Sequence, residues 1–116
     1  EYPIVHDKLM AYSFILTHEG YPCVFWQDYF TWNLAKEGTP NGIAALVEAH
    51  HHHAGGMSSV IYLDNTLYIM QRSGWGEQKG LLFVLNSKPQ SDGWNGARVQ
   101  TRWRNTTFKA VAWTEN

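Results

Sequence analysis

The sequence predicts an α+β protein, in which two helices and a short buried strand precede an antiparallel β-sandwich of five or more strands. Two observations predict this class. Before residue 55 the apolar residues recur at helical spacing, and after residue 56 they alternate or form short runs between Gly, Asn, Asp and Ser turns. The change of period predicts two units, residues 1–55 and residues 56–116.

The first predicted helix covers residues 7–18. Asp7 is a favourable N-cap, the segment contains neither Gly nor Pro, and Gly20 follows its end. The segment is apolar on almost all sides, so we expect it to be buried on most of them. The short apolar run PCVFW at residues 22–26 is typical of a strand buried on both faces. The sequence offers no second strand of this kind, so the unit is expected to be an incomplete βα arrangement.

An aromatic and polar loop at residues 27–40 leads into the second predicted helix. Pro40 suits the first helical position, and the apolar stripe at Ile43, Leu46 and Val47 has helical spacing. The Gly pair at residues 55–56 is expected to end this helix.

Five short strands are predicted after the second helix. Residues 60–63 and 67–70 form a hairpin around an Asp-Asn turn, and the apolar run at residues 81–85 is a central strand. Residues 98–103 alternate, and residues 108–113 form the last strand. Their regular spacing is typical of a small antiparallel sandwich or barrel.

Composition excludes several functional classes. The net charge of -1 gives no electrostatic footprint for nucleic acid, and no apolar run approaches the roughly 18 residues of a membrane helix. A single cysteine, Cys23, rules out an internal disulfide framework. Of the tract at residues 50–53, only His50 and His53 share a helix face, and two ligands are too few for a metal site. We therefore expect neither a metal nor a cofactor.

The aromatic content, 15%, is unusually high and supplies candidate binding residues. Trp75 and Trp94 lie in Gly-rich turns between predicted strands, where an exposed indole can stack on a sugar ring. The alternative for each is an indole that folds back over the sheet. Asp28 directly follows the predicted buried strand, at the end where barrel active sites gather, and Tyr29 and Trp32 lie beside it. Asp28 is a candidate sugar contact; its alternative is a structural role in the loop.

The segment AYSFILTHEGYPCVFWQDY at residues 11–29 resembles the α-amylases of glycoside hydrolase family 13. In that family it corresponds to the seventh helix and eighth strand of the TIM barrel, and residues 44–46 are similar to part of the eighth helix. The resemblance implies that residues 1–55 are the end of that barrel and residues 56–116 a Greek-key C-terminal domain. It also implies a secreted, starch-degrading parent that hydrolyses α-1,4-glucosidic bonds. The three catalytic carboxylates of the family would lie upstream of Glu1.

The predicted function is therefore a weak α-glucan-binding module, inactive or nearly so as a hydrolase. Its candidate carbohydrate-binding residues are Trp75, Trp94, Asp28, Tyr29 and Trp32. Two alternatives remain: an assembled fragment that retains some hydrolysis, with Asp28 as a weak catalytic candidate, and a structural domain without a ligand. We also expect a homodimer, because the edge of the strand at residues 22–26 and the apolar helix before it lack partners.

Overall fold

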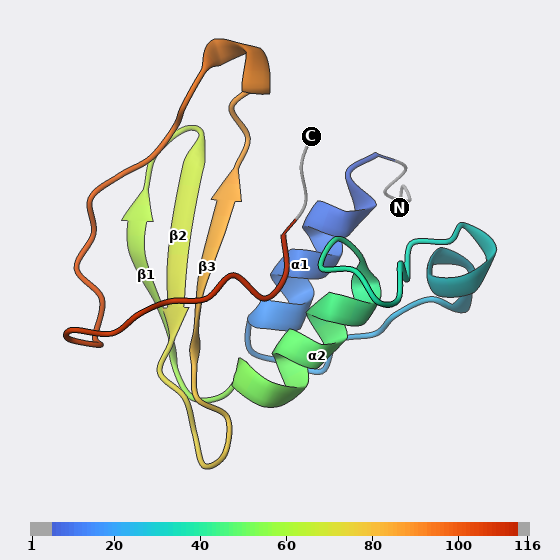
Figure 1. Ribbon diagram of the computed structural model, residues 1–116, viewed down its shortest axis with the longest axis horizontal. Helices are drawn as coiled ribbons and strands as arrows, with labels where there is room; N and C mark the ends of the chain where they lie inside the picture. The colour runs from blue at the N-terminus through green and yellow to red at the C-terminus, as the bar shows by residue number, and fades with distance from the viewer. Residues whose placement is uncertain (1–5, 114–116) are drawn as a thin grey trace.

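The computed structural model describes residues 6–113, so the outer ends of the two predicted units, residues 1–5 and 114–116, lie outside the described residues. The elements are α1 (Lys8–Thr17), the π-helical turn η1 (Gln27–Thr31), α2 (Ile43–His53), β1 (Ser58–Leu63), β2 (Leu67–Arg72), β3 (Leu81–Asn86) and the 3-10 turn η2 (Gln90–Asp92). Figure 1 shows the three strands on one side of the molecule and α1 and α2 on the other. The two predicted helices and the first three predicted strands are confirmed, with shifted ends.

The sheet is antiparallel, with strand order β1-β2-β3. In its centre Met70 of β2 pairs with Val60 of β1 and with Phe83 of β3. The predicted β1–β2 turn is stabilised by Asp64, whose Oδ1 accepts hydrogen bonds of 2.8 Å from the backbone N–H groups of Thr66 and Leu67. Because β2 is paired on both edges, it is the most buried of the three strands.

The prediction of a Greek-key sandwich of five or more strands is wrong. Residues 6–113 contain a single sheet of three strands, and residues 98–103 and 108–113 are extended coil. This coil crosses the sheet toward the helices (Figure 1), with Arg102 N–H donating to Gln71 Oε1 and Trp113 N–H donating to Pro40 O. An alternating sequence specifies which side chains share a face, but it supplies no neighbouring strand to pair with.

The prediction of a buried strand at residues 22–26 is also wrong. No strand forms there, and the side chains of Phe25 and Trp26 are largely exposed. The Phe25 N–H donates to the Tyr12 hydroxyl oxygen instead of to a neighbouring strand. A parallel strand requires hydrogen-bonded neighbours, and without them an apolar run has no reason to adopt ladder geometry.

Helices α1 and α2 pack against each other around a small core. Tyr12 and Leu16 of α1 meet Ile43 and Leu46 of α2 in this core. Helix α2 begins at Ile43, later than predicted, after Gly42 at its N-cap. A Cβ atom on Gly42 would overlap carbonyl oxygens of the preceding loop, so the close approach of that loop requires glycine.

Arg72 connects α1 to the sheet. Its buried guanidinium donates through Nη1 to the Thr17 carbonyl oxygen at 2.9 Å, and through Nη2 and Nε to the Gly56 carbonyl oxygen at 2.8 and 3.1 Å. Thr17 is the last residue of α1, so the cation also lies at the negative end of the helix dipole. Gly56 has φ 79°, a left-handed conformation that glycine adopts without strain.

Candidate functional site

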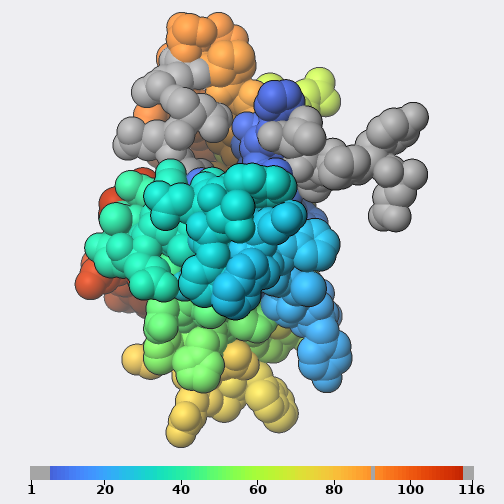
Figure 2. Space-filling view, turned by 90° about the vertical axis from the view of Figure 1, so that its right-hand side faces the viewer, coloured from blue at the N-terminus to red at the C-terminus, as the bar shows by residue number. Residues whose placement is uncertain are grey.

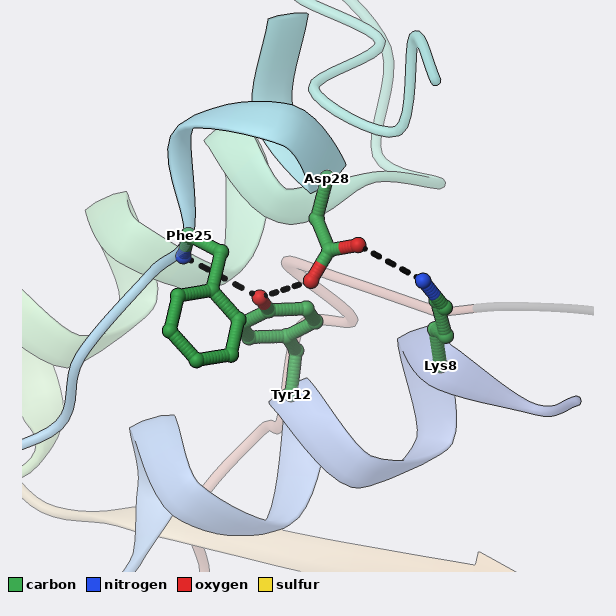
Figure 3. Close-up of polar contacts among 4 residues, drawn as sticks. All are labelled: Lys8, Tyr12, Phe25 and Asp28. Carbon is green, nitrogen blue, oxygen red and sulfur yellow. Dashed lines mark hydrogen bonds and ion pairs between the residues drawn. The ribbon is translucent and has the colours of Figure 1, made fainter. Parts of the chain in front are cut away.

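The centre of the candidate site is Asp28, which η1 places against the side of α1. Lys8 Nζ donates to Asp28 Oδ1 at 2.8 Å, and the Tyr12 hydroxyl donates to Asp28 Oδ2. The Phe25 N–H donates in turn to the Tyr12 hydroxyl oxygen at 3.2 Å. Figure 3 shows these groups as one chain of contacts between α1 and the segment that carries η1. The four-residue spacing of Lys8 and Tyr12 puts both on one face of α1.

These contacts determine the charges of the network. Burial raises the pKa of Asp28, but the hydrogen bonds from Lys8 and Tyr12 and the charge of Lys8 outweigh it, so the pKa lies below its usual value. Burial and the hydrogen bond to Asp28 raise the pKa of the Tyr12 phenol. At neutral pH Asp28 is therefore an ionised carboxylate with a hydrogen bond to each oxygen, and Tyr12 is a neutral donor.

The geometry of this network suits a structural role better than a catalytic one. A retaining glycosidase needs two carboxyl groups about 5–5.5 Å apart across the bond that breaks. Asp28 is instead buried beside an ammonium and a phenol, and both of its oxygens already accept hydrogen bonds from α1. In this structure Asp28 anchors the loop to α1 through both carboxylate oxygens, which favours a structural role; its role as a sugar contact stays a prediction.

The segment around Asp28 carries a group of rings, which we call the aromatic surface: the exposed Trp26, Phe30 and Trp32, and the half-buried Tyr29, which also packs against the core. Trp26 and Phe30 are 72% and 54% exposed, and their ring centroids lie 4.2 Å apart. The Phe30 and Tyr29 ring centroids are 4.7 Å apart, in an edge-to-face arrangement. In Figure 2 the light-blue to cyan part of the chain, which includes this segment, faces the viewer. Trp26, Phe30 and the half-buried Tyr29 thus form a contiguous set of rings, of which Trp26 and Phe30 are exposed. A contiguous exposed apolar patch is typical of a binding surface.

Trp32 is fixed on the same segment by a cation. Lys8 Nζ lies 3.6 Å from the Trp32 ring centroid, and the indole is 53% exposed. The ammonium that pairs with Asp28 thus also makes a cation–π contact.

A groove adjoins the aromatic surface through Tyr29. Its volume is about 680 Å³, and small apolar side chains of α2 form part of its wall. The Tyr29 hydroxyl donates to Glu37 Oε1 at 2.9 Å, and this hydrogen bond raises the pKa of Tyr29. The polar side chains that line the groove are those of Tyr29, Glu37, Thr39, Glu48, His52 and His53. The groove therefore combines an apolar wall with carboxylate, hydroxyl and imidazole groups that hydrogen-bond hydroxyls.

The other two candidate tryptophans lie apart from the aromatic surface. Trp75 is 78% exposed in the turn between β2 and β3, and Trp94 is 94% exposed beyond the far end of β3. The six residues of β3 span roughly 20 Å, so these two indoles belong to opposite ends of the sheet. Neither folds back over the sheet, but within residues 6–113 each is an isolated indole without an adjoining exposed ring. The structure thus brings Asp28, Tyr29 and Trp32 together and leaves Trp75 and Trp94 separate.

Within residues 6–113, which include the histidine tract of α2, no three or more His, Cys, Asp or Glu side chains are grouped so that they could hold a metal ion. His50 Nδ1 lies 3.0 Å from the Leu16 carbonyl oxygen, at the end of α1. The exposed His52 lies 3.2 Å from Glu48, one turn earlier in α2. The tract therefore contributes helix contacts and two groove-lining imidazoles.

Sequence reasoning missed Trp26, Phe30 and Lys8 as parts of the site. The apolar run places Trp26 in the expected strand at residues 22–26, although its spacing of four from Phe30 is the spacing at which rings meet on a helical turn. Nothing in the sequence indicated that Lys8 would contact Asp28, twenty residues later.

No protein-family model matches this chain. Within residues 6–113, none of the helices has the length and apolar content needed to cross a membrane.

Proposed function

We propose that this chain binds α-glucans, such as maltooligosaccharides and starch, on the aromatic surface and in the groove beside it. The observation that carries the proposal is the continuity of Trp26, Phe30 and Tyr29, whose rings adjoin one another while the Tyr29 hydroxyl reaches the groove wall. Flat exposed rings and a polar groove complement the two sides of a sugar chain.

The chemistry of a glucan matches both parts of the site. A pyranose ring has an apolar face of C–H groups, which packs on aromatic faces, and a rim of hydroxyls, which need hydrogen-bond partners. In the groove, the carboxylates of Glu37 and Glu48 accept such hydrogen bonds, and the hydroxyl of Thr39 donates or accepts.

The expected affinity is low. Stacking on each ring contributes about 1 kcal/mol, so two or three rings with a few solvated hydrogen bonds correspond to a Kd near 1 mM. Trp75 and Trp94, each a single exposed ring, are expected to add weaker contacts with long glucans.

We further propose that the chain is part of a starch-degrading α-amylase. The resemblance of residues 11–29 to that family supports this proposal, and an α-glucan is the ligand it implies. We assign no hydrolysis to the described residues, because the carboxylate of Asp28 is buried and engaged by Lys8 and Tyr12. The site supports binding and not bond cleavage.

Titration calorimetry with maltoheptaose tests the proposal. We expect a Kd near 1 mM for the wild type, a loss of several-fold in Phe30→Ala, and near wild-type binding in Phe108→Ala, a matched aromatic variant exposed outside the site. The β-linked cellohexaose is the control for linkage. A flat titration at about 10 mM maltoheptaose would contradict the proposal and identify a structural domain without a glucan ligand.

A parallel assay addresses the hydrolase alternative. Reducing ends released from soluble starch are measured for the wild type and for Asp28→Asn. We expect no release above background from either protein. Release by the wild type that disappears in the variant would show that the chain acts as an enzyme.

A further inference from the structure

We infer that Lys8 is a positioning residue for glucan binding: its ammonium, held by Asp28, fixes the indole of Trp32 so that one face is available to a sugar. This inference rests on the proposed function and adds how one part of the site is held in place.

Two contacts converge on the same ammonium. Lys8 Nζ lies 2.8 Å from Asp28 Oδ1 and 3.6 Å from the Trp32 ring centroid. The Lys8 side chain is 21% exposed and that of Asp28 is 7% exposed, so the cation is held largely away from water. A cation–π contact is stronger at a desolvated site, because water competes less for the charge.

The ion pair fixes where the ammonium lies. Asp28 is held by Tyr12 as well as by Lys8, so its carboxylate cannot follow a moving lysine (Figure 3). The backbone of the segment is fixed too, since Trp32 N–H donates to the Gln27 carbonyl oxygen at 2.8 Å and Leu34 N–H donates to that of Asp28 at 3.0 Å. The position of the cation over the indole is therefore determined from α1, not by the loop alone.

The indole of Trp32 has two faces, and the ammonium occupies one of them. Trp32 is 53% exposed, so in this proposal the face opposite the ammonium is the one that takes a pyranose ring. An exposed tryptophan that rotates freely would lose side-chain entropy when a sugar stacks on it. Contact with Lys8 restricts the Trp32 side chain already in the folded protein, so less entropy is lost when the ligand binds.

The test compares maltoheptaose binding among variants that distinguish the loss of the Lys8 charge from a loss of stability. Lys8→Met alone leaves Asp28 buried and unpaired, so the double variant Lys8→Met/Asp28→Asn is included, which removes both charges and keeps an acceptor for Tyr12. We expect the double variant to bind about threefold to tenfold more weakly than the wild type. Lys8→Arg keeps a positive charge beside Asp28 and Trp32 and is expected to bind more tightly than the double variant.

A spectroscopic readout reports on Trp32 directly. In an ¹H–¹⁵N NMR spectrum, the indole N–H peak assigned through Trp32→Phe should move in the double variant, while those of Trp75 and Trp94 stay in place. In the wild type, the side-chain methylene protons of Lys8 should show the upfield shift caused by the ring above which they lie. Unshifted Lys8 protons in the wild type would overturn the inference even if no variant folds.

The two proposals fail differently. If the wild type binds maltoheptaose, Trp32→Ala loses affinity and the folded double variant binds normally, the positioning role of Lys8 is wrong and the proposed function stands. If the wild type does not bind maltoheptaose at all, the proposed function is wrong, and the inference drawn from it fails as well.

Discussion

His18 Nε2 lies 2.8 Å from the hydroxyl oxygen of Tyr68, so the C-terminal end of α1 is hydrogen-bonded to the central strand of the sheet. The Nδ1 atom of the same ring lies 2.7 Å from the Phe14 carbonyl oxygen, which can only accept. Nδ1 therefore carries the proton, and Nε2 accepts from Tyr68. The neutral imidazole satisfies both neighbours.

The first prediction concerns pH. Burial lowers the pKa of His18, the charge of Arg72 lowers it further, and the Phe14 carbonyl and Glu19 oppose them, so the folded pKa lies below the unfolded value of 6.5. The unfolded chain then binds a proton more readily, and stability falls as the pH drops below 6.5 toward the folded pKa. We expect urea denaturation to show that the free energy of unfolding falls less between pH 7 and pH 5 in His18→Gln than in the wild type. Equal losses in both proteins would contradict this.

The second prediction concerns the buried ion pair. Lys8→Met leaves the Asp28 carboxylate buried without its cation and is expected to cost about 3–5 kcal/mol of unfolding free energy. The double variant Lys8→Met/Asp28→Asn is expected to recover much of this loss, since neither charge remains. Chemical denaturation of the four members of the double-mutant cycle measures the coupling. Additive losses would show that the two side chains do not interact.

The third prediction concerns Arg72. Arg72→Met removes three hydrogen bonds to the carbonyl oxygens of Thr17 and Gly56, and it is expected to cost about 2–4 kcal/mol. Arg72→Lys is expected to recover only part of the loss, because an ammonium cannot reproduce the planar fork of the guanidinium. The matched control is Arg98→Met at an exposed position, with an expected change below about 0.5 kcal/mol. Thermal unfolding followed by circular dichroism compares the three variants.

The fourth prediction concerns self-association. The strand edge at residues 22–26, from which the sequence predicts a homodimer, does not exist, so the expectation of a homodimer now rests on a different edge. Strand β1 is at the edge of the sheet, and its apolar residues Val60 and Leu63 are exposed. Exposed edge strands pair with other chains, whereas a charged side chain on the edge prevents pairing. We expect light scattering to give twice 13.3 kDa for the wild type and a smaller mass for Val60→Lys. A wild-type monomer at all concentrations would contradict this.

The elements that the sequence predicted correctly are those with a local cause. Helix α1 follows from a segment without breakers, α2 from an apolar stripe, and the β1–β2 hairpin from the turn chemistry of Asp64. In each case the decisive interactions lie within about a dozen residues of one another. Local periodicity is sufficient for such elements.

The elements predicted wrongly depend on distant partners. The run at residues 22–26 is apolar enough for a strand, but whether it forms one depends on neighbours that the described residues do not supply. Residues 98–103 alternate, yet they and residues 108–113 remain coil. Arg102 N–H donates to the side chain of Gln71, and Trp113 N–H donates to the carbonyl oxygen of Pro40 in a loop. Hydrogen-bond partners across a sheet are not encoded in one strand.

The candidate site was partly predictable. Asp28, Tyr29 and Trp32 stood out as aromatic and acidic residues in one loop, and the structure brings them together. The partner of Asp28 did not stand out, since Lys8 belongs to another element and its pairing depends on how α1 packs against η1. The exposure of Trp26 did not stand out either, because the sequence predicts that residues 22–26 form a buried strand.

The three hydrogen bonds of Arg72 have a consequence for how the molecule opens. One guanidinium joins the last residue of α1, the glycine before β1 and the end of β2, so none of these segments can separate without disrupting the other two. Local fluctuations that fray a helix end are thereby coupled to opening of the sheet. Amide protons near Thr17 and in the first residues of β1 should exchange with solvent at closely similar rates. We therefore expect the end of α1 and the start of the sheet to open as a single cooperative unit.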